Sequence, residues 1–354
     1  MTTLLPYAHG GPPLRCVLRA TPEDFIVDED LGFEPDGAGE HLLVRVEKRG
    51  ANTEWVARAL AKMAGVAPDA VSFAGMKDRH AVARQTFSIQ LPARADPDAS
   101  KWAHPEFRVL EAVRHSRKLR RGALKGNRFE ITLRDTVGDH AAVAARLDAI
   151  AAAGVPNYFG EQRFGHGGAN VERARRVFAG ERVRRHELGV FLSAARAQIF
   201  NAVVATRIAA GTWDRALDGE VWMLAGSHSI FGPEPITPEL LERQRQGDIV
   251  ATGPLWGAGP LRSGAEVAAI EEGVAAQNAE LAAGLVRFDL RQERRALTLH
   301  ARDVAAEWID PTSLRIRFWL NSGSYATAFL REICDWGEEG EQPAAAGSVG
   351  PADA

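Results

Sequence analysis

Short stretches of alternating apolar and polar residues recur along this chain, and helical patterns interrupt them in no regular order. One face of a strand over residues 314–320 would carry Leu314, Ile316, Phe318 and Leu320. Other strand patterns lie at residues 15–27, 40–48, 86–91, 128–133, 220–224 and 297–300. A doubly wound parallel sheet requires strands and helices in strict alternation, so this order predicts an α+β fold with mixed or antiparallel sheets.

Helical patterns separate these strands. Asn52 or Thr53 would cap a helix that ends at Gly65, and Asp139 would cap an alanine-rich helix that ends at Gly154. Further helices are expected at residues 170–179, 193–210 and 265–283. A length of 354 residues favours two domains, at roughly 150 residues each.

Several classes of protein are disfavoured by the composition. No apolar run approaches the roughly 18 residues of a transmembrane helix, and the first residues do not have the pattern of a signal peptide. Cys16 and Cys334 stand alone, and the ten histidines have no metal-ligand spacing. We therefore expect a cytoplasmic protein without a membrane segment, a metal site or a redox pair.

Charge is placed unevenly along the chain. Residues 335–354 contain five acidic residues and no lysine or arginine, and residues 337–354 are expected to form a disordered acidic tail. Residues 114–128 contain seven lysine or arginine residues and no acid. Six of these are candidates for binding phosphates, namely Arg114, Arg117, Lys118, Arg120, Arg121 and Lys125. A solvated basic face is the commoner explanation of such a run.

One carboxylate stands out in residues 71–91. Asp78 lies at a turn marked by Gly75, between two strand-like runs, and it is surrounded by basic residues. Those neighbours are Lys77, Arg79, His80 and Arg84. Nearby positive charge favours the ionised form of a carboxylate, which is the form needed for nucleophilic or base chemistry. The alternative interpretation is a salt-bridged surface turn.

Motifs for bound cofactors are not found. The glycines around Gly257 precede Pro260 and lack the strand–turn–helix context of a dinucleotide site. The sequence has neither a phosphate-binding lysine loop nor an HExxH zinc motif. Ser193 and Ser227 lack the context of a nucleophile elbow. The chain is thus expected to act without a cofactor or metal.

Six segments, taken in order, resemble the TruD family of tRNA pseudouridine synthases over residues 6–336. They are RATPEDFIVDEDLGFEPDGAGEHLLVRVEKRGANT, FAGMKDRHA, RKLRRGALKGNRF, PNYFGEQRFG, LSAARAQIFN and FWLNSGSYAT. The resemblance implies an α+β fold with a pseudouridine synthase-type catalytic domain, split between residues 1–154 and 301–336. Residues 155–300 would form an inserted α/β TRUD domain.

The resemblance also implies roles for particular residues. Asp78 looks like the catalytic aspartate, and Phe129 looks like the aromatic residue that stacks on the target uracil, with Asn127 beside it. Arg19 falls where relatives often have a lysine that pairs with the aspartate, and Tyr325 falls where they often have phenylalanine. The expected supporting residues are therefore Arg19, Lys77, Asn127, Phe129 and Tyr325.

The implied reaction isomerises uridine to pseudouridine in tRNA, at uridine 13 of the D arm, without a cofactor. The six basic residues of the 114–128 run would contact the tRNA backbone, and the protein would act as a monomer with no obligate protein partner and no membrane. Two alternatives stay open: a catalytically silent RNA-binding or RNA-folding protein, and a nucleotide- or metal-dependent RNA-modifying enzyme such as a methyltransferase. A nucleophilic and a glycal route also both stay open.

Overall fold

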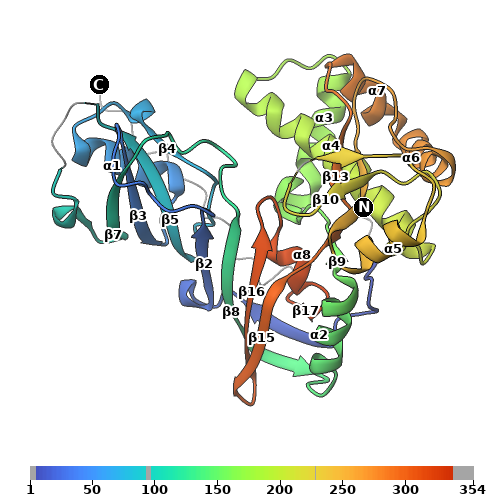
Figure 1. The fold of residues 1–354 in the computed structure, drawn as a ribbon, viewed down its shortest axis with the longest axis horizontal. Helices are drawn as coiled ribbons and strands as arrows, with labels where there is room; N and C mark the ends of the chain where they lie inside the picture. The colour runs from blue at the N-terminus through green and yellow to red at the C-terminus, as the bar shows by residue number, and fades with distance from the viewer. Residues whose placement is uncertain (1–4, 93–96, 228, 338–354) are drawn as a thin grey trace. The chain divides into compact units, whose positions relative to one another are not determined.

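The computed structural model describes residues 5–92, 97–227 and 229–337, and the chain forms two compact units (Figure 1). Within the described residues, unit 1 consists of residues 5–12, 141–302 and 323–333, and unit 2 consists of residues 13–140, 303–322 and 334–337. The predicted acidic tail, apart from Gly337, lies outside the described residues. Residues 141–154 and 323–333, which the sequence placed in the catalytic domain, make their contacts within unit 1. The proposed domain insertion itself stays a prediction.

Unit 2 is built around one mixed sheet. Its strands are β1 (Leu14–Leu18), β2 (Phe25–Asp30), β3 (His41–Arg49), β4 (Val71–Phe73), β5 (Val82–Gln90), β6 (Ala103–His104), β7 (Phe107–His115), β8 (Gly126–Gly138), β15 (Arg302–Asp310), β16 (Ser313–Asn321) and β17 (Cys334–Asp335). The main order is β15-β16-β8-β2-β5-β3-β7-β6, and β1, β4 and β17 pair off this path. Strands β2 and β5 are parallel, whereas β3 is antiparallel to both β5 and β7. The predicted α+β class with a mixed sheet is confirmed.

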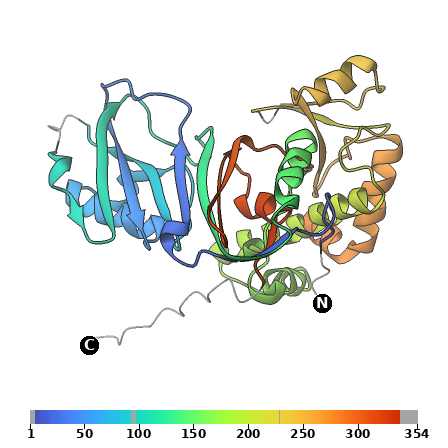
Figure 2. The ribbon, with the colours of Figure 1, turned by 90° about the horizontal axis from the view of Figure 1, so that it is seen from below.

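Among the described residues, the α-helix of unit 2 is α1 (Thr53–Ala64), which lies against the sheet (Figures 1 and 2). Asn52 caps it by accepting a hydrogen bond from the backbone of Glu54, and Gly65 ends it in the left-handed region at φ 64°. Its apolar side packs on buried residues of β3 and β5. Both predicted ends of this helix are confirmed.

Strand β16 places its apolar residues as the sequence predicts. Leu314, Ile316, Phe318 and Leu320 are all buried. Strand β16 pairs antiparallel with β8, so that Phe318 lies opposite Phe129. This register brings together residues that are far apart in the sequence.

Unit 1 is mostly helical. Its helices are α2 (Ala142–Ala153), α3 (Ala169–Phe178), α4 (Arg185–Ala209), α5 (Pro238–Arg245), α6 (Ala265–Gln277), α7 (Ala279–Arg287) and α8 (Ala326–Leu330). Its strands are β9 (Val155–Pro156), β10 (Trp222–Leu224), β11 (Ile230–Phe231), β12 (Ile249–Leu255), β13 (Glu293–Ala296) and β14 (Thr298–Leu299). They form a sheet of order β11-β10-β12-β13 and a separate β14-β9 pair.

Helix α4 is the central helix of unit 1 and contacts α3, α6, α7 and β12 (Figure 1). Its stretch Glu187–Ala209 is long and apolar enough to cross a membrane by length and composition, and half of its most apolar segment is buried inside the protein. The prediction concerned an unbroken apolar run, and this stretch is interrupted by Arg196, Gln198 and Asn201. The burial is that of a core helix, because Ala194, Phe200 and Val203 lie in the hydrophobic core.

Helix boundaries differ from the sequence-based prediction in three places. Helix α4 starts at Arg185, before the expected start at residue 193. The expected helix over residues 265–283 is two helices that break at Asn278, whose side-chain amide donates to the carbonyl of Val274. Helix α2 starts at Ala142 and is not capped by Asp139. The reason is that β8 continues to Gly138, where it pairs with Leu14 of β1, so the chain reaches helical geometry later.

Candidate active site

Asp78 lies on the loop between β4 and β5, as the sequence predicts. Thr53, at the start of α1, fixes this loop because its hydroxyl oxygen accepts a hydrogen bond from the backbone N–H of Lys77 at 3.0 Å. The side-chain amide of Gln85 also donates to the carbonyl of Gly75 at 2.5 Å. The buried start of a helix and a buried strand thus hold the loop from two sides.

The carboxylate of Asp78 pairs with Arg19. Nη2 of Arg19 lies 2.7 Å from Oδ2 of Asp78, and the two side chains are only 13% and 22% exposed. The other carboxylate oxygen accepts the backbone N–H of His80 at 3.1 Å. Arg19 itself has φ 60°, which is uncommon for a residue other than glycine and stores some backbone strain. Asp78 therefore forms an oriented, partly buried ion pair. The alternative interpretation of this segment was a salt-bridged turn on the surface.

Lys48 is a member of this site that the sequence analysis missed. Its side chain is buried, and Nζ donates to the carbonyl oxygens of Ala51 at 2.7 Å and Asp78 at 2.8 Å. Burial lowers the pKa of Lys48 to about 8, although the charge of Asp78 acts in the opposite direction. A signal was present: Lys48 is in phase with Val44 and Val46, the inward-facing residues of β3.

Lys77 connects Asn127 to a buried acid, Glu29. Nζ of Lys77 donates to Oδ1 of Asn127 at 2.7 Å and lies 3.0 Å from Oε1 of Glu29. The other oxygen of Glu29 accepts the backbone N–H of Thr86 at 2.9 Å. Because a lysine can only donate, the Asn127 carbonyl must face it, and the amide NH2 is left to donate elsewhere. Glu29 was also missed by the sequence analysis.

Gly126, beside Asn127, is required by close packing. A Cβ atom at this position would lie 2.3 Å from the carbonyl oxygen of Leu320 and equally close to the ring of Trp319. Glycine therefore lets β8 approach β16 at the point where Asn127 joins the site.

Phe129 is largely buried in an aromatic cluster. Its ring stacks on Phe318 with centroids 5.2 Å apart, and it meets the edge of Phe25 at 6.1 Å. The guanidinium of Arg19 lies over Phe25, 4.4 Å from the ring centroid. Phe25 thus connects the Arg19–Asp78 pair to Phe129. That Phe129 stacks on a uracil stays a prediction.

Some residues of the basic run 114–128 make contacts that stabilise the fold, and others are exposed without an ion pair. Arg114 donates to the carbonyl of Leu91, and the guanidinium of Arg121 lies 4.0 Å from the ring centroid of Phe73. Six exposed residues of the run form no ion pair within the part of the chain that the structure describes, namely Arg117, Lys118, Arg120, Arg121, Lys125 and Arg128. The backbone N–H of Gly122 donates to the carbonyl of Ala74 at 2.7 Å, so the run is fixed to the segment that leads into the Asp78 loop. RNA contact by these residues stays a prediction.

A cavity of about 520 Å³ lies on unit 2 next to these residues. It is lined by Glu29 of the site and by Lys125 and Arg128 of the basic run. Further acids from β2 and β7 also line it, including Asp28 and Glu111. The cavity therefore presents mixed charge.

Tyr325 belongs to unit 1, at the start of α8 and not on the last long strand. Its hydroxyl oxygen accepts a hydrogen bond from Nη2 of Arg163 at 2.7 Å. That Tyr325 supports the active site stays a prediction. The described residues contain no group of three or more His, Cys, Asp or Glu side chains that could hold a metal ion.

Comparison with known proteins matches two stretches of the chain, residues 3–171 and 171–333, to the family model described as tRNA pseudouridine synthase D (TruD). The chain belongs to the TruD family. A tRNA pseudouridine synthase D of Xanthomonas axonopodis pv. citri is 48% identical over 356 residues and covers 96% of both chains. The protein of that name from Methylococcus capsulatus is 45% identical, over 95% of this chain and 96% of its own length.

The fold also resembles a solved structure. The crystal structure of the putative tRNA pseudouridine synthase D from Methanosarcina mazei aligns with a TM-score of 0.70 and 24% identity. The alignment covers 93% of this chain and 95% of the other. At this identity the likeness supports the fold, while family membership rests on the sequence relatives.

Proposed function

We propose that this TruD family member isomerises uridine 13 in the D arm of tRNA to pseudouridine, with Asp78 as the catalytic carboxylate. The observation that carries the assignment of Asp78 is its 2.7 Å ion pair with Arg19 in a partly buried loop. The guanidinium of Arg19 complements an anionic carboxylate and orients it. Tyr325 and the exposed basic residues 117, 118, 120 and 125 would contribute to binding the substrate.

The chemistry explains why an ionised carboxylate is needed. The bond between C1′ of the ribose and N1 of uracil breaks, the base rotates, and C5 bonds to C1′; the C5 proton leaves and N1 is protonated. The product is an isomer of the substrate. Asp78 would either attack C1′ as a nucleophile or remove a ribose proton to give a glycal, and both routes start from the deprotonated side chain.

The base must leave its stack to reach Asp78. Flipping costs a few kcal/mol, and stacking on an aromatic side chain returns about 1–3 kcal/mol per base. Since Phe318 covers one face of Phe129, a uracil would use the opposite face. The NH2 group of Asn127, oriented by Lys77, would donate to a uracil carbonyl.

We also infer that the catalytic domain is split around an inserted TRUD domain at residues 155–300, and that the enzyme works on tRNA as a cytoplasmic monomer without an obligate protein partner. In support of a split domain, unit 2 is itself assembled from stretches that are separated in the sequence.

The test uses unmodified tRNA transcripts with wild-type protein and Asp78→Asn. Wild type should convert uridine 13, as read by carbodiimide labelling and primer extension, whereas Asp78→Asn should bind the transcript with the wild-type Kd and give no product. Product formed by Asp78→Asn would refute the assignment of Asp78. A wild-type protein that binds but never converts any uridine would instead support the silent RNA-binding alternative.

A further inference from the structure

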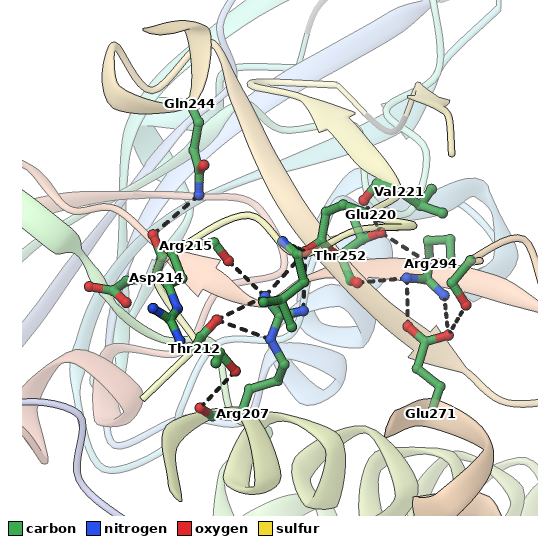
Figure 3. A network of polar contacts seen from close by, with 12 residues as sticks. Arg207, Thr212, Asp214, Arg215, Glu220, Val221, Gln244, Thr252, Glu271 and Arg294 are labelled. Atoms are coloured by element: carbon green, nitrogen blue, oxygen red, sulfur yellow. Dashed lines mark hydrogen bonds and ion pairs between the residues drawn. The ribbon is translucent and has the colours of Figure 1, made fainter. Parts of the chain in front are cut away.

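Unit 1 neutralises its most deeply buried arginines with carboxylates. Arg207 lies 3.1 Å from Glu220, and Arg294 lies 2.8 Å from Glu271 (Figure 3). All four side chains are at most 3% exposed. Burying a charge without a partner costs several kcal/mol, so this pairing is what a stable interior requires.

Two other arginines of unit 1 do not follow this rule. Arg163 and Arg295 both lie over the ring of Phe159, with Cζ at 5.5 and 4.2 Å from its centroid. Among the described residues, neither forms an ion pair with a carboxylate. Arg295 follows Arg294 directly on β13, yet only Arg294 has an acidic partner.

The two guanidinium groups differ in what holds them. Arg295 donates to the side-chain oxygen of Asn157 at 2.7 Å and to the backbone carbonyls of Asn157 and Gly323. The pKa of Arg295 is lowered to about 10, mainly by burial; Tyr325 opposes the shift and the nearby charge of Arg163 contributes to it. Two guanidinium groups therefore lie at the same aromatic ring, and neither has a carboxylate partner among the described residues.

Arg163 is held by two hydroxyl groups instead. It donates from Nη1 to Oγ of Ser193 at 2.9 Å and from Nη2 to the hydroxyl oxygen of Tyr325 at 2.7 Å. A hydroxyl that accepts from an arginine keeps its own hydrogen to donate. Within the described part of the chain, neither hydroxyl donates to another protein group. Arg163 is only partly buried and has five N–H groups, of which two are used here.

We infer that Arg163, Ser193 and Tyr325 form a binding site for a single backbone phosphate of the RNA, with Arg295 supplying further positive charge. The remaining N–H groups of Arg163 and the two hydroxyl hydrogens would donate to the phosphate oxygens. A planar guanidinium fork matches phosphate geometry. The choice of RNA as the source of the phosphate rests on the proposed function.

The test measures the Kd of the wild-type protein and its variants for a tRNA transcript over a series of salt concentrations. Arg163→Gln should weaken binding several-fold and reduce the slope of log Kd against log salt by about 0.7–0.9, the value expected for the loss of one phosphate contact. Arg163→Lys should restore the slope because the charge returns. The double variant Ser193→Ala and Tyr325→Phe should weaken binding without changing the slope, because it removes only neutral donors.

The matched control is Arg175→Gln. Arg175 is also on unit 1, but it already pairs with Glu280 at 2.7 Å, so its loss should leave the slope unchanged. The inference fails if Arg163→Gln keeps the wild-type slope, if the double variant keeps the wild-type Kd, or if Arg175→Gln changes the slope equally. Product formation by the wild type is read on the same transcript. If the wild type forms product but Arg163→Gln keeps the wild-type slope, only the phosphate site is refuted. If Arg163→Gln has the reduced slope but the wild type forms no product, only the isomerase activity is refuted.

Discussion

The ammonium group of Lys48 donates to the main-chain carbonyl of Asp78 at 2.8 Å. The proposed catalytic residue is thus held at two points, by Lys48 through its backbone and by Arg19 through its carboxylate. A carboxylate that must reach one ribose atom needs such fixation, because a displacement of about 1 Å can cost roughly 100-fold in rate.

Lys48→Met is expected to lower kcat by roughly 10- to 100-fold while the Kd for tRNA stays near that of wild type. Methionine fills a similar space but cannot donate to the carbonyls of Ala51 and Asp78. Single-turnover conversion together with filter binding measures the two effects separately. Lys62→Met, on the end of α1, is a control that removes one lysine outside the site. An unchanged kcat in Lys48→Met would show that the loop does not depend on this anchor.

Lys48 also predicts a pH dependence of stability. Its pKa in the folded protein is about 8, below the usual 10.5, because burial disfavours the charge. Between these values the unfolded chain binds more protons, so the contribution of Lys48 to the free energy of unfolding rises with pH from about 8 to 10.5. Urea unfolding at pH 7.5 and 9.5 should show wild type gaining stability relative to Lys48→Met. A difference that stays constant over this range would contradict the lowered pKa.

Arg19→Met is expected to reduce kcat by roughly 10- to 100-fold, since a hydrogen bond to a charged group contributes about 1.5–3 kcal/mol. Arg19→Lys should keep much more activity because it retains the charge beside Asp78. The comparison of the two variants in single-turnover assays separates charge from packing. Equal activity of both variants would mean that the ion pair does not support the reaction.

Phe129→Ala is expected to destabilise the protein by about 3–5 kcal/mol, because the residue is buried against Phe318 and Phe25. Phe318→Ala is the matched control, since it empties the other side of the same stacked pair and should cost a similar free energy. Only Phe129→Ala should also abolish most turnover, because only Phe129 would contact the uracil. Chemical unfolding gives the stability of both variants. Conversion is then measured at temperatures below their unfolding transitions. Equal turnover in the two would assign Phe129 a purely structural role.

Much of the fold followed from local sequence patterns. The caps of α1 at Asn52 and Gly65 were predictable because capping depends on a few adjacent residues. The position of Asp78 on a loop between two strands was predictable for the same reason. The break at Asn278 was not, since the alanine-rich pattern continues through it.

The candidate site likewise combines features that follow from local sequence with contacts that depend on the tertiary structure. The sequence alone determined that the chain is α+β and that a single acid stands among bases at a turn, because strand period, helix period and turn residues are local properties. Only the tertiary structure decided that Lys48 and Glu29 join Asp78 and Lys77, and that Phe129 lies against Phe318. These contacts depend on sheet register between distant segments, and register is set by the packing of the whole unit and not by any one stretch of sequence.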